Sequence, residues 1–428
     1  MNIAKLSLLV MASALVSGCG YSSSASFRDM SAAYREVVES YSNDNILINV
    51  VRASKRMPVS FLDIPSIVGS GNVSSGVGIG ANVSSRAPGS IPGFFSADPV
   101  NGLSSYAPNA SLSVSGGFTF TQSSLDNAMF MKPFLSEIQP DIVRYLSNNQ
   151  VAPNSVLFTL VVDSIEVISS SKDVLYKFSN DPRLPDYDKF QVAMYLMVAA
   201  GLTTEQVPTK LPVSPPFGVD VLKQNLGQLT GVLPAGVIVE AVPKTSPQQY
   251  QLVRIAPVVR LCLNRSDSET IFKKMLDESI YCAQQVKTRG PTKEALELAK
   301  LIDADSLKEK VSIAITLRST RNVFDFLGTV VSMQNAENPI FVSLIDPSQV
   351  ESSPGKTIAD LKSTPLFIVN KNKSTGRAIT TVKYDGDTYS IPADTKGYTN
   401  DVIVLLSQLL TLNKIAGSIP PSPSVLVR

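Results

Sequence analysis

Any catalytic site in this 428-residue sequence has to work without histidine, because the chain contains none. This excludes Ser-His-Asp and Cys-His arrangements, and zinc or non-haem iron sites of the usual kind. The carboxylates of Asp163 and Glu166 lie near the end of an expected strand, at a spacing that favours opposite faces. Acid–base catalysis needs both carboxylates at one substrate. We therefore expect a solvated strand end here and a protein that is not an enzyme.

Oxygen ligands for a metal ion are concentrated at Asp181, Asp186 and Asp188. Carboxylates are the ligands that Ca²⁺ prefers, but the spacing of an EF-hand is missing. Pro182 and Pro185 favour a rigid turn in the same stretch. We expect no metal ion and no cofactor.

Two cysteines in the body of the chain, Cys262 and Cys282, are the candidates for a disulfide. A bridge would close a loop of about 20 residues and stabilise the fold by roughly 3 kcal/mol in the chain-entropy model. Two buried free thiols are the alternative, because sequence spacing does not fix the distance between the Cα atoms.

The N-terminus predicts export. Lys5 supplies the positive charge and Leu6–Val16 the short apolar segment of a secretory signal peptide, which we place at residues 1–18. The segment Val16-Ser17-Gly18-Cys19 that ends it resembles a bacterial lipobox. The resemblance implies that Cys19 is acylated and becomes the first residue of the mature chain. The alternative is an ordinary secretory signal followed by an incidental cysteine.

The residue after Cys19 is relevant to which membrane the lipidated chain would be anchored in. Gly20 stands where inner-membrane lipoproteins often carry aspartate, so the resemblance implies an anchor in the outer membrane. Two or more acyl chains give stable attachment there. That compartment is also oxidising, which favours the disulfide.

Residues 64–125 are rich in serine and glycine, and only Arg86 and Asp98 carry charge. Two runs within this segment alternate between mostly apolar and small uncharged residues. This period predicts strands, because successive side chains leave opposite faces of a pleated backbone. Each run is near the roughly 9–11 residues that a tilted strand needs to cross a bilayer. The residues expected to face the membrane are Val73, Val77, Ile79, Ala81, Val83, Ala110, Leu112, Val114, Phe118 and Phe120.

The two runs predict a membrane-inserting hairpin, with the proline-containing tract Ser84–Asn109 as its loop. One hairpin cannot span a bilayer alone, because its outer edges would leave backbone N–H and C=O groups unpaired. About eight strands form the smallest closed barrel, so at least about four chains must each supply a hairpin. The alternatives are a disordered Ser/Gly linker and a hairpin on a soluble sheet.

The rest of the mature chain predicts an α+β class, with mixed envelope domains around the inserted hairpin. We expect a lipidated tether and an N-terminal helix over 19–63, and α+β domains over 129–263 and 264–428. The second domain would end in a helix and an extended tail. Alternation from Val156 to about Ile168 predicts a buried strand, and Asp385-Gly386 predicts a hairpin turn.

Within 19–63, residues 20–26 are expected to form the tether. Apolar residues from Phe27 to Tyr41 then recur at helical spacing, and Asn43-Asp44-Asn45 is a candidate interruption or cap. The apolar stripe is typical of ordinary core packing, which we favour. Packing on a neighbouring protomer is the alternative.

Three segments, Asn43–Ile64, Ser319–Gln334 and Pro365–Pro392, resemble a group of uncharacterised bacterial lipoproteins. The similar phrases include the residues Asn45–Ala53 and Tyr384–Pro392. This resemblance implies a location in the cell envelope and implies no activity.

These observations favour an outer-membrane lipoprotein that forms an oligomeric β-barrel pore or export conduit. The plan is similar to that of the curli-secretion channel lipoproteins, which combine acyl anchors with inserted hairpins, without a shared motif.

The expected partners are membrane lipid through acylated Cys19, further copies of the chain, and other envelope or secretion proteins. The formal net charge of +2 provides no field for nucleic acid. The alternative is a non-pore lipid-anchored envelope scaffold or appendage-assembly adaptor, and an enzyme acting through carboxylates ranks last.

Overall fold

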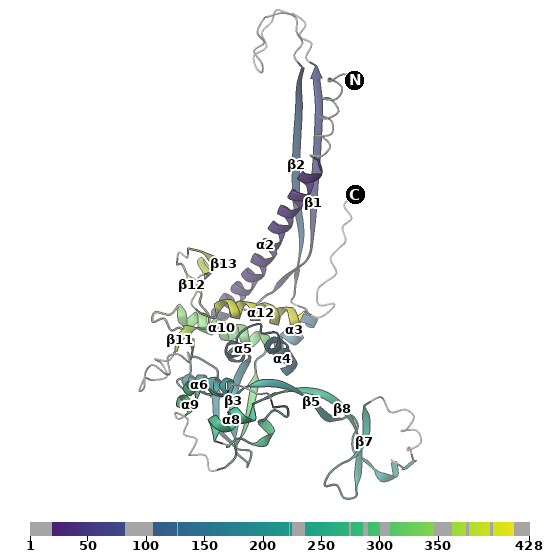
Figure 1. Cartoon of the computed structure of the whole chain (residues 1–428), viewed down its shortest axis with the longest axis vertical. Coiled ribbons are helices and arrows are strands. Elements are labelled where there is room, and N and C mark those ends of the chain that lie inside the picture. Colours follow the sequence, from purple (N-terminus) through teal and green to yellow (C-terminus); the bar gives the residue numbers. More distant parts are fainter. Residues whose placement is uncertain are drawn as a thin grey trace, which may run out of the picture. The chain divides into compact units, whose positions relative to one another are not determined.

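The computed structural model describes residues 19–81, 106–125, 127–221, 223–224, 236–273, 275–285, 290–299, 309–345, 362–373, 376–393 and 397–414. The signal peptide at 1–18, Val83 and the extended tail lie outside the described residues. The described chain contains helices and antiparallel sheets (Figure 1), which confirms the α+β class.

The helices are α2 (Cys19–Ser54), α3 (Ala128–Leu135), α4 (Pro140–Asn148), α5 (Asn154–Val161), α6 (Tyr187–Ala199), α8 (Arg265–Phe272), the 3-10 helix η1 (Glu278–Ile280), α9 (Lys293–Ala299), α10 (Thr320–Gln334) and α12 (Thr399–Asn413). The longer strands are β1 (Leu62–Ala81), β2 (Tyr106–Ser124), β3 (Val162–Ile168), β4 (Val174–Ser179), β5 (Thr203–Pro212), β7 (Val237–Ala241), β8 (Gln249–Cys262), β9 (Ser312–Leu317), β13 (Ala378–Tyr384) and β14 (Asp387–Pro392). The shorter ones are β6 (Phe217–Gly218), β10 (Ser343–Ile345), β11 (Lys362–Pro365) and β12 (Asn370–Lys371).

The chain divides into a hairpin unit, Leu62–Ser124, and a body that contains the described residues up to Phe61 and from Leu125 onward.

Helices α2 and α10 pack against each other in the body. In addition, α2 contacts α12, and α10 contacts α3. The C-terminal half of α2 is completely buried at Leu47, Val50 and Val51. Gly328 of α10 permits the close approach, since a Cβ atom there would lie 2.6 Å from the carbonyl carbon of Ala53. A residue with a side chain at this point would push the two helices apart.

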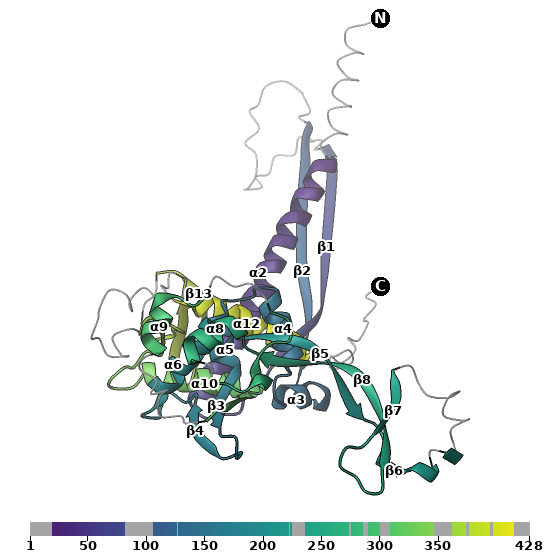
Figure 2. The same cartoon turned by 60° about the horizontal axis from the view of Figure 1, so that its bottom comes forward.

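The sheet β4-β3-β9 joins segments from both expected α+β domains, because β3 pairs with β9 in antiparallel register. The expected boundary between 263 and 264 therefore runs through one compact unit. A second sheet has β8 at its centre, with β5 and β6 on one edge and β7 on the other. Figure 2 shows β5 and β8 running together away from the helices of the body.

The small sheet β12-β14-β13 is closed by a tight turn at Asp385-Gly386. The φ angles of these residues are 54° and 80°, as a type I′ hairpin turn requires. The predicted turn is therefore confirmed. Lys55, just after α2, donates a hydrogen bond of 2.8 Å to Asp385, and this bond raises the pKa of Lys55.

The tether prediction is wrong, because residues 20–26 belong to α2. The candidate interruption at Asn43–Asn45 does not end the helix either. The segment Cys19–Ser54 contains no proline to break the hydrogen-bond ladder. Asp44 instead accepts a hydrogen bond from the hydroxyl of Thr380 on β13, which ties the helix to the small sheet.

The strand predicted over Val156–Ile168 is half wrong. The structure forms helix α5 up to Val161 and only then strand β3. All residues from Val156 to Val161, including Thr159, are buried, so this stretch has no exposed polar face. Period alone cannot separate a helix from a strand in such a run.

We predict that Gly328→Ala lowers the free energy of unfolding by about 1–3 kcal/mol, because the new methyl group meets backbone atoms of α2. Gly218→Ala is the control, since a Cβ atom there has no neighbour within 4 Å. Urea unfolding of the full chain in mild detergent measures both. Equal stability of the two variants would contradict the close approach of α2 and α10.

Candidate functional site

Strands β1 and β2 form an antiparallel ladder of 20 and 19 residues. Its register shifts once, between Asp63 and Ser66, where Pro65 lies in β1. Asp63 is the one charged residue in the two strands as described. The rest of the ladder therefore carries no side chain whose charge would forbid contact with hydrocarbon.

The register places the two alternating runs opposite each other, and many of its pairs join residues of similar kind, although Ser75 is opposite Leu112. Val73 is opposite Val114, and Val77 is opposite Ala110. One position along, Ser74 is opposite Ser113. Directly opposed residues belong to the same face of a two-stranded sheet. The register thus combines the apolar sets of the two runs on one side and the small polar sets on the other.

The loop prediction for Ser84–Asn109 is partly wrong, since β2 begins at Tyr106. Pro108 lies within this strand, opposite Ile79. Proline is tolerated in a strand where its missing N–H would point to an open edge. The assignment of particular side chains to the membrane, including Phe118 and Phe120, stays a prediction.

The two ends of the hairpin enter the core of the body at neighbouring positions. Phe61 and Leu125 are 1% and 2% exposed, and the N–H of Leu125 donates to the carbonyl of Phe61 at 3.0 Å. The ring of Phe61 lies 5.1 Å from Phe324 of α10 and 5.2 Å from Phe134 of α3. Phe130 completes the cluster at 6.0 Å.

A buried asparagine holds the chain just before the hairpin. The side chain of Asn49 donates to the carbonyl of Ser60 and accepts from its N–H, both at 2.8 Å. The same amide also donates to the carbonyl of Asn45, one turn back in α2. We call Asn49, Ser60, Phe61 and Leu125 the hairpin root. Sequence analysis missed it, although a single asparagine within the apolar run Ile46–Val51 is the signal that could have identified it.

The segments Asn43–Ile64, Ser319–Gln334 and Pro365–Pro392 contact one another in the body. Phe61 contacts Phe324, Gly328 abuts Ala53, and Lys55 binds Asp385. These parts of the three segments therefore belong to one packed region of the body.

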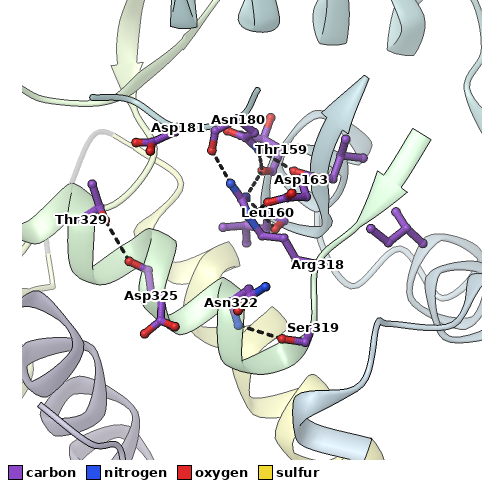
Figure 3. Close-up of polar contacts among 12 residues, drawn as sticks. Thr159, Leu160, Asp163, Asn180, Asp181, Arg318, Ser319, Asn322, Asp325 and Thr329 are labelled. Atoms are coloured by element: carbon purple, nitrogen blue, oxygen red, sulfur yellow. Dashed lines mark hydrogen bonds and ion pairs between the residues drawn. The ribbon is translucent and has the colours of Figure 1, made fainter. Parts of the chain in front are cut away.

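Arg318 forms a second cluster, at the junction of β9 and α10 (Figure 3). Its guanidinium donates to the carbonyls of Thr159 and Leu160 at 3.3 and 3.1 Å, and to the carbonyl of Asn180. Thr159 and Leu160 lie in the last turn of α5, whose carbonyls have no partners within the helix. Arg318 therefore caps α5 from a distant part of the chain, which explains why helix gives way to strand at Val162.

The environment of Arg318 keeps it charged. Burial lowers its pKa to about 10, while Asp163, 3.5 Å away, opposes this shift. The guanidinium also stacks on Phe326 at 4.1 Å from the ring centroid. At neutral pH the group remains a cation, because its pKa stays well above 7.

The carboxylates considered for catalysis bind different cations. Asp163 faces Arg318, whereas Glu166 accepts a hydrogen bond of 2.6 Å from Lys177. Asp181, considered for calcium, accepts hydrogen bonds from Arg183, which lower the pKa of Asp181. Each carboxylate thus takes part in an ion pair within its own neighbourhood.

The predicted cysteine pair lies at disulfide distance, with 5.0 Å between the Cα atoms of Cys262 and Cys282. Among the described residues, these two sulfurs and Glu205 form a group close enough to hold a metal ion. The disulfide leaves no thiolate to bind one. Glu205 accepts hydrogen bonds of 2.8 Å from Arg260 and from the N–H of Ala283.

Beside this disulfide lies a groove of about 590 Å³. Its polar lining consists mainly of amides and hydroxyls, with Arg144 and Glu205 as the charged members. Arg144 donates to Gln206 at 2.7 Å, and Glu205 is held as described above. The groove therefore presents a polar surface on which Glu205 is paired with Arg260 and Arg144 is hydrogen-bonded to the neutral amide of Gln206.

No protein-family model, curated protein or solved structure matches this chain. Among the helices that the structure describes, none is both long enough and apolar enough to cross a membrane.

We predict that Asn49→Asp lowers the free energy of unfolding by about 2–4 kcal/mol. The substitution keeps the shape but replaces the amide donor with a buried charge beside the carbonyls of Asn45 and Ser60. Asn322→Asp, at an exposed position in the first turn of α10, is the matched control and should change stability by less than about 0.5 kcal/mol. Urea unfolding of both variants tests this, and a harmless Asn49→Asp would show that the root does not depend on the amide.

Arg318→Met should destabilise the fold by roughly 2–4 kcal/mol, because buried carbonyls lose their donor. Arg318→Lys should restore less than half of this loss, since a single ammonium cannot reproduce the planar fork or the stacking on Phe326. Arg183→Met removes an arginine whose side chain is 57% exposed and should cost at most about 1 kcal/mol. Thermal unfolding monitored by circular dichroism would rank the three variants, and full rescue by lysine would refute the proposed geometry.

Proposed function

We propose that this chain is a lipid-anchored protein of the bacterial outer membrane whose copies assemble a shared β-barrel. Each copy contributes β1 and β2, and the barrel serves as a pore or export conduit. The observation that carries the proposal is the ladder itself, which is long, has no charged residue beyond Asp63, and places the two alternating runs opposite each other.

The open edges of the ladder require further strands if it enters a bilayer. In hydrocarbon each unpaired N–H or C=O group costs several kcal/mol, and the outer edges of β1 and β2 carry a row of such groups. Copies of the same chain supply matching edges. Closure at about eight strands or more then requires at least about four chains.

Only part of the hairpin would lie within hydrocarbon. A tilted strand crosses the bilayer with about 9–11 residues, whereas β1 and β2 contain 20 and 19. The distal half contains Val73–Ala81 and the residues opposite them, so we assign it to the membrane. The half nearest Phe61 and Leu125 would continue the barrel into the aqueous space next to the body.

The opposite face of the distal half would line the conduit. Its residues are Ser74, Gly76, Gly78, Gly80, Ala107, Asn109, Ser111 and Ser113. Such a neutral, small and polar surface suits passage of a polypeptide or polymer better than selection of ions.

The membrane anchor in this proposal is acylated Cys19, the first residue of α2. The Cys262–Cys282 pair supports a location outside the cytoplasm, since disulfides persist in oxidising compartments. We propose further copies of the chain as the main partner, together with other envelope or secretion proteins that deliver the cargo. Catalysis has no part in this role.

We predict that Val77→Lys abolishes conductance in planar bilayers whereas Ser74→Lys retains it. A cation on the lipid face costs about 2–4 kcal/mol at the bilayer midplane, while a position in the lumen remains hydrated. Leu112→Lys and Ser113→Lys form a second matched pair on β2. Conductance is the appropriate readout, because an acylated Cys19 would keep every variant attached to the membrane.

The same experiment distinguishes the pore from a lipid-anchored scaffold. Equal effects of lysine at Val77 and Ser74 would show that the strand does not have a lipid face and a lumen face. A wild-type chain that is a monomer in mild detergent and shows no conductance would contradict the pore and favour the scaffold.

A further inference from the structure

Strand β5 is an edge strand, and its open side borders the groove beside the disulfide. Among the described residues, β5 pairs with β8 and with no other strand. The groove is lined by Thr203–Gln206 of β5 but by no residue of β8, so it lies on the side of β5 that faces away from β8. This is the place where a further strand would have to bind.

The register determines which backbone groups of β5 point into the groove. Pro208 lies directly opposite Pro257, and two prolines cannot exchange N–H···O=C bonds, so theirs is a non-hydrogen-bonded pair. The N–H of Val213 donates to the carbonyl of Leu252 at 2.9 Å, which agrees with the same alternation. Thr204 and Gln206 have the parity of Pro208, so their N–H and C=O groups point away from β8.

These outward groups are available for pairing. Within the part of the chain that the structure describes, the outward N–H and C=O groups of Thr204 and Gln206 have no backbone hydrogen-bond partner. A row of unpaired groups of this kind is a template for another strand. Farther along the edge, Pro208 lacks an N–H and Lys210 carries a charge, and both features discourage pairing. The part of β5 that can accept a strand is therefore the part that lines the groove.

The groove has one wall on each face of the sheet. The side chain of Gln206 accepts a hydrogen bond from Arg144 of α4, which lies beside β5 (Figure 2). The side chain of Glu205 leaves the opposite face and accepts from the N–H of Ala283. The residues on either side of Ala283 line the groove and form its second wall. An extended chain would thus lie between two walls, with the edge of β5 as the floor.

The two charged residues of the walls differ in their partners. Glu205 is neutralised by Arg260 at 2.7 Å. Arg144 donates to the neutral amide of Gln206, and none of the described carboxylates forms an ion pair with it. A guanidinium presents several donors in a planar fork that matches a carboxylate. The groove therefore favours a ligand that carries negative charge beside α4.

We propose that an extended acidic segment of another polypeptide binds in this groove as an added strand on β5. Its backbone pairs with the outward groups of Thr204 and Gln206, and one of its carboxylates binds Arg144. In the proposed conduit, this segment belongs to the polypeptide that is exported. The assignment of the ligand as cargo therefore rests on the proposed function.

Backbone chemistry and charge distinguish this ligand from two others. Residues 415–428 of the chain itself contain no aspartate or glutamate, so they offer no acidic side chain to Arg144. A neutral oligosaccharide would suit the amides and hydroxyls of the lining. It does not present N–H and C=O groups at the repeat of about 6.8 Å that two residues of a strand have. An acidic peptide satisfies both the edge and the arginine.

Peptide binding to the full-length wild-type chain in mild detergent tests the added strand. The probe is a fluorescein-labelled eight-residue peptide of alternating valine and threonine with one central glutamate, and fluorescence anisotropy gives its affinity. Two further forms carry N-methyl groups on the odd or on the even residues. An added strand uses the N–H groups of alternate residues only, so one form should bind at least about tenfold more weakly than the other.

Three results of this measurement would overturn the inference. The first is no binding of the parent peptide, and the second is equal affinity of the two N-methylated forms. The third is tighter binding of labelled chitotetraose, a neutral oligosaccharide, which would assign the groove to a glycan.

Arg144→Gln tests the charge. It should weaken binding of the glutamate peptide about fivefold and leave binding of a matched glutamine peptide within about twofold of wild type. An equal loss for both peptides would show that Arg144 does not bind the carboxylate.

A pair of proline variants tests the position of the added strand. Gln206→Pro removes an outward N–H without interrupting the ladder with β8, and it should weaken the glutamate peptide at least about tenfold. Lys210→Pro has the same parity but lies beyond Pro208, so it should leave the affinity within about twofold of wild type. Urea unfolding checks that both variants fold, and equal affinities of the two would contradict pairing at Thr203–Gln206. The N-methylated peptides decide the question on the wild-type chain if a proline variant does not fold.

These outcomes separate the inference from the pore. A conducting wild-type ring that does not bind the peptide would refute the groove as a peptide site and leave the pore intact. Peptide binding with the expected N-methyl pattern by particles that do not conduct would support the site and refute the pore. A wild-type chain that neither conducts nor binds the peptide would refute both.

Discussion

The arrangement of the body depends on one constraint: both hairpin ends are buried, and the ring of Phe61 lies in an aromatic cluster. Phe61 and Leu125 lie far apart in sequence, yet their backbones are joined by one hydrogen bond of 3.0 Å. The cluster draws Phe130 and Phe134 from α3 and Phe324 from α10. Aromatic pairs at these distances add to the free energy of burying their apolar area. Helices α2, α3 and α10 must therefore keep their positions for the hairpin to begin and end at one place.

Two arginines also join segments that are distant in sequence, in other parts of the body. Arg318 holds the last carbonyls of α5 together with that of Asn180, and Arg260 holds the carbonyl of Tyr281 at 2.8 Å while it binds Glu205. A planar fork with several donors can join backbone segments that are distant in sequence, which a hydrophobic contact does less precisely. The ends of irregular segments are fixed in this way, where regular hydrogen-bond ladders stop.

Local patterns were sufficient to predict some of these elements. Strands β1 and β2 follow from the alternation in the two runs, and the turn at Asp385-Gly386 follows from its two residue types. Both signals depend only on neighbours in sequence, so the sequence was enough to predict these elements. Helix α5 was predicted wrongly because its end is determined by Arg318 and Asn180, which no local window contains. Asn49 of the hairpin root could have been noticed in the sequence, but its partner Ser60 and the contact between Phe61 and Leu125 could not, since these residues meet only in the folded chain. The continuous α2 shows the reverse error: the asparagines at 43 and 45 suggested a break, whereas the helix continues and its residues Asp44 and Asn49 form tertiary hydrogen bonds.

The adjacency of Phe61 and Leu125 has a consequence for how such a protein can change over generations. Because the chain leaves and re-enters the body at one point, the stretch between them is an insert that the rest does not need in order to close its core. Its length and composition can drift, or the whole insert can be exchanged for another, as long as the two bordering residues still meet. In the proposed pore, variation in the width or length of the conduit would then arise from this one insert, while the body stays the same.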